Sequence, residues 1–186
     1  METIKRRYFF VKNYFKDYKI ATGFRSSQFL IKKIVKELPD NLNIIIEQGA
    51  GDGVMTQAIL KKLAPNGRLI VIEPNQYFLS LLKSINDPRI IIFEGLAQDF
   101  DYKKYLTEDK QADLIISSIP FYFLTEEERH GFCKNVHKNL SNNGQFIIFH
   151  QYRSIMKEVV AQHFKNVAVD YTIFNMFPCF IIKATK

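Results

Sequence analysis

The sequence predicts a doubly wound α/β domain: a seven-stranded, mostly parallel, Rossmann-like sheet between helices, ending in an antiparallel hairpin. Three observations predict it. Short apolar runs alternate with helical stretches from about Asn43 onward, a glycine-rich turn follows the first run, and only three residues separate the last two runs. The chain has 186 residues, which suits one domain with a core of its own.

The first five apolar runs have the composition of strands that are buried on both faces of a parallel sheet. They are Asn43–Glu47, Arg68–Glu73, Ile90–Phe93, Asp113–Ser117 and Gln145–His150. The helical stretches between them are Met55–Leu63, Gln76–Ser84, Lys103–Glu108 and Thr125–Asn139. Such alternation places helices on both faces of the sheet and a ligand beyond the carboxyl ends of the strands.

The C-terminal part of the chain predicts a hairpin. A helix over Ser154–Phe164 precedes two strands, Val167–Phe174 and Pro178–Ala184. These strands must be antiparallel, because a parallel crossover needs about a dozen residues or more and the connection Asn175-Met176-Phe177 has three.

The positive charge of the chain is concentrated at its N-terminus. Residues 1–36 hold ten Lys and Arg against two acids, 10 − 2 = +8, whereas the other residues sum to 16 − 17 = −1. We therefore divide the chain into a basic N-terminal segment, 1–36, and an α/β domain, 37–186. A polyanionic partner, either a membrane or a nucleic acid, is expected to meet the N-terminal segment.

The start of the N-terminal segment has the pattern of an amphipathic helix with an aromatic face. The face consists of Ile4, Tyr8, Val11, Phe15 and Tyr18. Lysines and arginines flank this face, which suits an anionic bilayer surface. The alternative is a helix packed on the α/β domain as a lid, and the two are compatible if the lid opens at the membrane.

Composition limits the other function classes. No apolar run approaches the roughly 20 residues that span a bilayer, and METIKRRYFF lacks a signal-peptide core, so we expect a cytoplasmic protein. Cys133 and Cys179 are expected to be free thiols, and the four histidines are scattered, so no metal site is expected. A monomer is expected.

The turn after the first strand carries the cofactor prediction. Glycines there allow a tight turn and a close approach of cofactor atoms to the backbone. Glu73 ends the second strand about twenty residues later, where an acid accepts hydrogen bonds from both hydroxyls of an adenosine ribose. The loop reads GxGxG rather than GxGxxG, and an acid, Glu47, precedes it, which disfavours dinucleotide binding.

The segment Glu47-Gln48-Gly49-Ala50-Gly51-Asp52-Gly53 resembles the first motif of class I methyltransferases, and Glu73 resembles their second. The resemblance implies S-adenosyl-L-methionine (SAM) as cofactor, with Glu47 near the ammonium of its methionine end and Glu73 on the ribose. The cofactor-binding residues are then Glu47, Gly49, Ala50, Gly51, Gly53, Glu73, Pro74, Leu96, Ala97 and Ser117. Relatives place an acid where Leu96 stands; Gln98, Asp99 or the backbone of Leu96 and Ala97 are the alternatives for adenine.

The fourth strand ends in Ser117-Ser118-Ile119-Pro120-Phe121-Tyr122-Phe123, which resembles the acceptor motif of two families. Ribosomal RNA adenine dimethyltransferases have an asparagine at the position of Ser118. Bacterial phospholipid (phosphatidylethanolamine) N-methyltransferases have a serine at the position of Ser117. The segments 21–30, 149–152 and 175–180 also resemble the phospholipid family, with Arg25 and Phe177 at positions where that family has proline.

The resemblance implies an N-methyltransferase acting on a lipid amine such as phosphatidylethanolamine, located peripherally on the inner face of the membrane. The alternatives are an RNA adenine N6-methyltransferase and a small-molecule methyltransferase. The candidate catalytic residues, which hold the acceptor or steer its proton, are Ser117, Ser118, Pro120, Phe121, Tyr18, His150 and Tyr152, with Tyr14 and Arg153 beside them.

Overall fold

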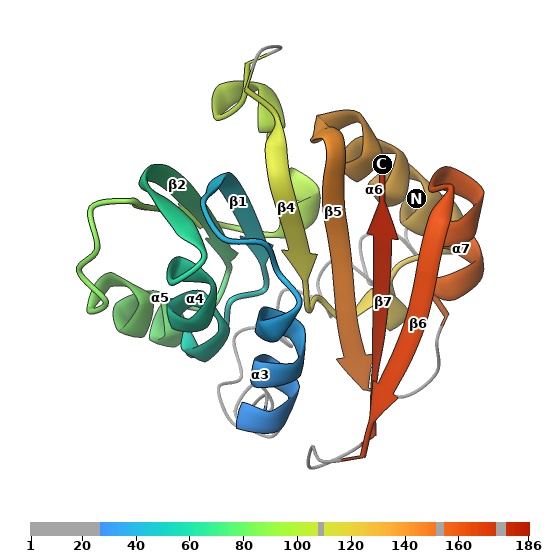
Figure 1. Ribbon diagram of the computed structural model, residues 1–186, viewed down its shortest axis with the longest axis horizontal. Coiled ribbons are helices and arrows are strands. Elements are labelled where there is room, and N and C mark those ends of the chain that lie inside the picture. Colours follow the sequence, from blue (N-terminus) through green and yellow to red (C-terminus); the bar gives the residue numbers. More distant parts are fainter. Residues whose placement is uncertain (1–26, 108–109, 152–154, 174–177) are drawn as a thin grey trace, which may run out of the picture.

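The computed structural model describes residues 27–107, 110–151, 155–173 and 178–186 (Figure 1). Their seven strands form one sheet in the order β3-β2-β1-β4-β5-β7-β6. The strands are β1 (Leu42–Gln48), β2 (Leu63–Glu73), β3 (Ile90–Glu94), β4 (Ala112–Ser117), β5 (Leu140–Gln151), β6 (Asn166–Thr172) and β7 (Cys179–Thr185). The first five pair in parallel, and β7 pairs antiparallel with both β5 and β6. The predicted sheet and its antiparallel end are confirmed.

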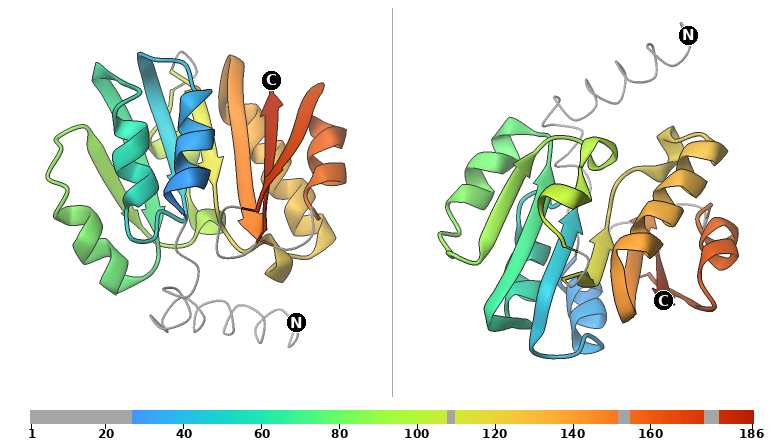
Figure 2. Two further views of the ribbon diagram at one scale, coloured as in Figure 1. Left: turned by 60° about the horizontal axis from the view of Figure 1, so that its bottom comes forward. Right: turned by 90° about the horizontal axis from the view of Figure 1, so that it is seen from above.

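Helices cover both faces of the sheet (Figure 2). They are α3 (Gln28–Lys36), α4 (Val54–Leu60), α5 (Gln76–Lys83), α6 (Glu126–Asn139) and α7 (Lys157–His163), with short 3-10 turns η1 (Ala97–Asp99), η2 (Tyr102–Lys104) and η3 (Phe121–Phe123). Side chains of α3, α4 and α5 pack on one face, and those of α6 and α7 pack on the other. The arrangement is the predicted doubly wound architecture.

Alternation along the strands divides the core into two clusters. Ile45 faces the α3 side of the sheet while its neighbour Ile46 faces the α6 side, and neither side chain is exposed to solvent. This explains the unbroken apolar runs, since a strand covered on both faces has no polar side. Burial of one such isoleucine contributes about 1.5–3 kcal/mol to folding.

One predicted helix is wrong. Among the described residues of the stretch expected to be helical over Lys103–Glu108, only the end of the 3-10 turn η2 is found. Tyr102 and Leu106 are both buried in the core on the α6 side, and the chain turns back at once toward β4, so no exposed helical face develops.

Two strands, β2 and β5, begin five residues earlier than predicted. β2 begins at Leu63 and β5 at Leu140. Both strands include the turn residues that precede their apolar runs, because pairing with β1 and β4 resumes before these turns after a shift in register. The predicted hairpin connection, 175–177, lies outside the described residues, and only the antiparallel pairing of β6 with β7 is seen.

The helix α3 begins at a capped end and buries one face. The hydroxyl of Ser27 accepts a hydrogen bond from the backbone N–H of Leu30 at 3.1 Å. Leu30, Ile31 and Ile34 are buried in the same cluster as β1. The C-terminal part of the predicted segment 1–36 therefore packs on the sheet, whereas the predicted aromatic helix lies outside the described residues.

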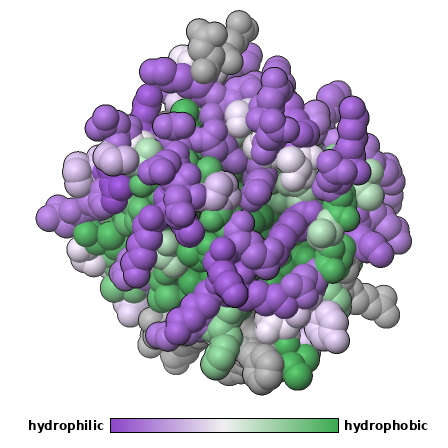
Figure 3. Space-filling view, in the orientation of Figure 1, coloured by the Kyte–Doolittle hydropathy of each residue, from purple (hydrophilic) through white to green (hydrophobic). Residues whose placement is uncertain are grey.

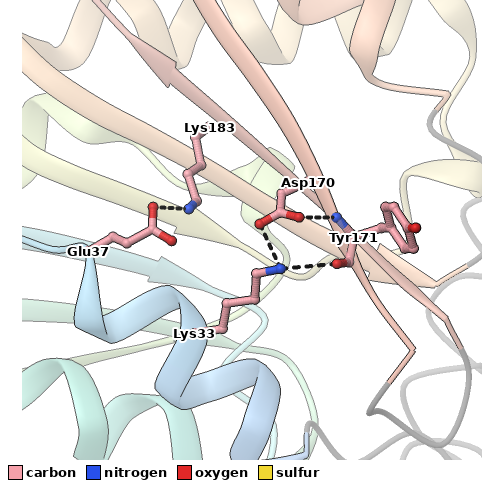
Figure 4. Close-up of polar contacts among 5 residues, drawn as sticks. All are labelled: Lys33, Glu37, Asp170, Tyr171 and Lys183. Carbon is pink, nitrogen blue, oxygen red and sulfur yellow. Dashed lines mark hydrogen bonds and ion pairs between the residues drawn. The ribbon is translucent and has the colours of Figure 1, made fainter.

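Polar contacts fix the direction of α3 across the sheet (Figure 4). Lys33 Nζ lies 2.7 Å from a carboxylate oxygen of Asp170 and donates to the carbonyl of Tyr171 at 3.1 Å, near the carboxyl end of β6. Glu37 pairs with Lys183, which lies farther from the carboxyl ends of the parallel strands. The first turn of α3 consequently lies at the edge where the parallel strands end.

Candidate functional site

The candidate site lies where the strand order switches. β1 and β4 are neighbours, and the chain continues from β1 toward β2 and from β4 toward β5, in opposite directions. The turns after both strands meet at the edge toward which the arrowheads of β4 and β5 point in Figure 1. Ser118 joins them, since its hydroxyl donates to the carbonyl of Gly49 at 2.6 Å and its N–H to the carbonyl of Gln48 at 3.0 Å. A ligand is expected in the crevice beside such a switch point.

The glycine turn after β1 has the backbone conformation that only glycine adopts easily. Gly49 and Gly51 have φ angles of 80° and 55°. A Cβ on Gly49 would lie 3.1 Å from the hydroxyl oxygen of Ser118, whereas one on Gly51 would meet nothing within 4 Å. The backbone of Gly51 is thus open to an approaching ligand. Ala50 is buried, and Gly53 begins α4 as its N-cap.

Glu73 lies at the end of β2 and is 2% exposed. One carboxylate oxygen accepts from the N–H of Gly51 at 2.8 Å, and the other from the N–H of Asn75 at 2.9 Å. Burial raises the pKa of Glu73, and these two hydrogen bonds act against the rise. Each oxygen retains a second acceptor position, which a ribose hydroxyl can use. Glu73 therefore links the second strand to the glycine turn.

Glu47 lies at the end of β1 and is buried, with its carboxylate accepting from the hydroxyl of Thr56 in α4 at 2.6 Å. Burial raises its pKa to about 8, against the effect of the Thr56 hydroxyl, and the nearby carboxylates of Glu73 and Asp52 add to the rise. The carboxyl group is thus mostly neutral at pH 7. A cation placed beside it would shift the group toward its ionised form.

An apolar pocket opens beside these groups, with an empty volume of about 370 Å³ that includes its open mouth. It is lined by Gly49, Ile72, Pro74, Leu96, Ala97, Gln98, Ile119, Pro120, Phe123 and Leu124. Aliphatic walls of this kind suit a flat aromatic ring. Of the groups considered for adenine, Leu96, Ala97 and Gln98 line the pocket, and Asp99 does not.

The acceptor motif after β4 is divided between the pocket and the core. Pro120 lines the pocket, and Ser118 holds the glycine turn. Ser117 has no exposed surface, and Phe121 is 2% exposed with its ring packed against Phe132 at 5.1 Å. Both side chains therefore lie in the core, and their catalytic roles stay predictions.

The remaining catalytic candidates are placed only in part. His150 is half-buried near the end of β5, with its ring centroid 6.5 Å from that of Phe180. Tyr14, Tyr18, Tyr152 and Arg153 lie outside the described residues. Their roles stay predictions.

The sequence interpretation missed Thr56, the hydrogen-bond partner of Glu47, and the pocket residues Phe123 and Leu124. Thr56 lies nine residues after Glu47 at a buried position of α4, and a hydroxyl inside an otherwise apolar helix face was the signal available. Both cysteines are buried and free, as expected. Within the described ranges, no three His, Cys, Asp or Glu side chains gather as metal ligands.

The arrangement fits SAM. Glu73 and the open backbone of Gly51 suit the ribose, the apolar pocket suits adenine, and Glu47 suits the methionine ammonium. Bound SAM supplies an electrophilic methyl group on a sulfonium. What the protein adds is orientation of the acceptor and exclusion of water, since the donor carries its own leaving group.

Comparisons with known proteins identify the family of the chain. A family described as methyltransferase domain matches residues 45–144. An ornithine lipid N-methyltransferase of Singulisphaera acidiphila is 28% identical over 130 residues, which are 68% of each chain. The N-methyltransferase NodS of Bradyrhizobium japonicum has a similar fold, with a TM-score of 0.68, 14% identity, and coverage of 85% of this chain and 93% of NodS.

A SAM-dependent methyltransferase of Mesorhizobium loti also shares the fold, with a TM-score of 0.61, 12% identity, and coverage of 84% and 98%. The family match spans 100 of the 186 residues and includes the glycine turn, Glu73 and the pocket. The chain therefore belongs to the methyltransferase domain family and is a class I, SAM-dependent methyltransferase.

Proposed function

We propose that this methyltransferase transfers methyl groups to the amine of a lipid headgroup, with a phospholipid such as phosphatidylethanolamine as the first candidate. One support is the similarity to an ornithine lipid N-methyltransferase, whose name identifies an amine-bearing lipid as its substrate. The observation that carries the proposal is a set of exposed apolar side chains at the edge of the sheet that holds the cofactor pocket.

We call these side chains the apolar rim. They are Phe29 (68% exposed), Tyr77 (50%), Tyr122 (76%), Tyr171 (65%) and Ile173 (63%). Only one other large apolar residue of the described part of the chain is exposed, Val169 in the middle of β6. In the orientation of Figure 1, hydrophobic residues are visible across the middle of the molecule and at a few places on its lower end (Figure 3).

Each member of the apolar rim is placed at this edge by its element. Tyr77 lies in the first turn of α5 after the end of β2, Tyr122 lies in η3 after β4, and Tyr171 lies near the end of β6. Phe29 is in the first turn of α3, one turn before the Lys33 contact with β6. Four aromatic rings at one edge suit the headgroup region of a bilayer, where amphipathic rings concentrate.

The basic N-terminal segment supports the same surface. Residues 1–36 sum to +8, and about 1 kcal/mol per Lys or Arg is typical of attraction to an anionic leaflet. No helix of the described residues is both long and apolar enough to cross a bilayer. We therefore propose peripheral association of a monomer with the inner leaflet through residues 1–36 and the apolar rim.

The acceptor amine of such a headgroup is mostly protonated at neutral pH and must lose a proton before it attacks the methyl group. We propose His150, together with Tyr14, Tyr18, Tyr152 and Arg153, for holding the headgroup phosphate or accepting that proton. The half-buried position of His150 at the end of β5 supports this proposal. Ser118 instead uses its hydroxyl within the protein.

The test is a methyl-transfer assay with radiolabelled SAM and four acceptors. These are vesicles of phosphatidylethanolamine with phosphatidylglycerol, vesicles of ornithine lipid with phosphatidylglycerol, ribosomal RNA, and soluble ethanolamine. Mass spectrometry of the vesicle lipids is expected to show added methyl groups. Methylation of RNA or of the free amine, without methylated lipid, would refute the lipid proposal.

A second measurement tests the apolar rim. Replacing both Tyr171 and Ile173 by serine is expected to weaken vesicle flotation and lipid methylation about tenfold, while SAM binding is unchanged. Asn166→Ser, at the exposed opposite end of the same strand, is the matched control. Equal flotation of the rim variant and the control would show that the rim does not contact lipid.

A further inference from the structure

A buried polar cluster lies beneath the cofactor pocket. It consists of Gln48, the last residue of β1, Tyr102 in η2, and Ser117, the last residue of β4. Gln48 and Ser117 have no exposed surface, and Tyr102 is 4% exposed. The side-chain amide of Gln48 donates to the hydroxyl of Tyr102 at 2.9 Å.

The register of the sheet separates this cluster from Glu47 and Glu73. Gln48 and Ser117 are paired residues of parallel strands, so their side chains leave the sheet on the same face. That face is the α6 side, where Tyr102 packs with Ile46 and Ile72. Glu47, one residue earlier, faces α4 on the other side and bonds Thr56.

The cluster is incompletely satisfied within the protein. Among the described residues, neither Oε1 of Gln48 nor Oγ of Ser117 has a hydrogen-bond partner. Buried polar atoms without partners destabilise a fold, and an apolar side chain at the same position would avoid this. The preceding inward residues on these strands, Ile46 and Ile115, are apolar. The single hydrogen bond from Gln48 to Tyr102 is therefore what fixes the Gln48 side chain.

Two parts of the pocket lining, Gly49 and the segment Leu96–Gln98, are connected to this cluster. Gly49 follows Gln48 directly and begins the glycine turn. The adenine wall, Leu96–Gln98, leads into Tyr102 through Phe100, whose ring centroid lies 4.9 Å from that of Tyr102. The hydrogen bond between Gln48 and Tyr102 thus ties the adenine wall to the strand that carries the glycine turn.

We propose that Gln48 and Tyr102 are a positioning pair for SAM: their buried hydrogen bond sets the separation of the adenine wall from the glycine turn. A hydrogen bond holds two segments at a defined distance and angle, which apolar contact alone does not. Neither residue lines the pocket, so both act through the residues that do. The inference depends on cofactor binding and is independent of the proposed lipid substrate.

The test is Tyr102→Phe in the full chain, with SAM binding measured by calorimetry. This change removes the hydroxyl and leaves the amide of Gln48 without its partner. We expect the Kd for SAM to rise about 5- to 20-fold, and the KM for SAM to rise in parallel, with kcat at saturating SAM within about twofold of the wild type. The control is Tyr105→Phe, a half-buried tyrosine of the same segment whose ring stacks on Phe100.

A double-mutant cycle separates positioning from general stability. Gln48→Leu is expected to weaken SAM binding as Tyr102→Phe does. The double variant is expected to bind SAM more tightly than the sum of the two losses predicts, because it leaves no unpaired partner. Equal Kd values for Tyr102→Phe and Tyr105→Phe would overturn the proposal. So would additive losses, or Kd values that follow the melting temperature across all variants.

Discussion

Glu47 gives the sharpest quantitative prediction, because its side chain is buried and its pKa is raised to about 8 from an ordinary value near 4.5. At about 1.4 kcal/mol per pH unit, ionised Glu47 costs the folded protein on the order of 5 kcal/mol relative to the unfolded chain. Between about pH 4.5 and pH 8, the Glu47 carboxyl group keeps its proton in the folded state and has lost it in the unfolded state. Stability is therefore expected to fall as pH rises from about 4.5 to about 8, and to level off above.

Replacing Glu47 with glutamine removes this dependence. The amide oxygen of glutamine can still accept the hydrogen bond from Thr56 and carries no charge to desolvate. At pH 7 the variant without cofactor is expected to be more stable than the wild type by about 3 kcal/mol, which is the part of the cost already reached at that pH. Urea unfolding between about pH 5 and pH 9 measures this difference.

The same change is expected to weaken cofactor binding. The ammonium of SAM favours ionised Glu47, so binding below about pH 8 should release up to about one proton from the wild type and none from this position in Glu47→Gln. Calorimetry in two buffers of different ionisation enthalpy counts the protons, and the Kd of the variant should rise about tenfold or more. The control is Glu94→Gln, which changes an exposed carboxylate at the end of β3. Equal proton release by the wild type and Glu47→Gln would refute the reasoning.

Three further predictions concern other groups. Gly51→Ala is expected to cost about 1 kcal/mol of stability because of the positive φ angle at this position. It is expected to weaken SAM binding more than about tenfold, since the added Cβ enters space that the ligand uses. Unfolding and calorimetry of this one variant measure the two effects. Glu73→Gln keeps one acceptor oxygen and should raise the Kd for SAM about tenfold; an unchanged Kd would remove Glu73 from the ribose site. Burial and the neighbouring His130 lower the pKa of His163; a ring nitrogen of His163 lies 3.1 Å from one of His130. The stability of the folded protein is therefore expected to fall as pH drops below about 6.5. Urea unfolding of His163→Gln should show a weaker dependence of stability on pH in this range.

The sheet was predictable because its signals are local. Isoleucine-rich runs between polar turns predict buried strands, and the short connection before β7 requires antiparallel pairing. The helix expected over Lys103–Glu108 was wrong because Leu106, and Tyr102 just before the stretch, pack in a core made by distant strands. Nothing within those residues reveals that packing.

The candidate site was predictable where a short motif determines geometry, and less so elsewhere. The glycine turn and the position of Glu73 follow from the ends of two adjacent parallel strands. The surroundings of each side chain in the motif after β4 depend on which face of the sheet the side chain points toward. Ser117 faces the core whereas Ser118 reaches across to Gly49, and a one-residue difference in strand end would exchange the two.

The same alternation explains why Glu47 and Gln48, which are adjacent in the chain, have separate surroundings. Glu47 faces α4 and pairs with Thr56, where a change alters charge at the methionine end of the cofactor. Gln48 faces the α6 side and pairs with Tyr102, where a change alters the spacing of the pocket walls. The two pairs lie on opposite faces of the sheet. Losses of SAM affinity from Glu47→Gln and Tyr102→Phe should therefore add, whereas those from Gln48→Leu and Tyr102→Phe should not.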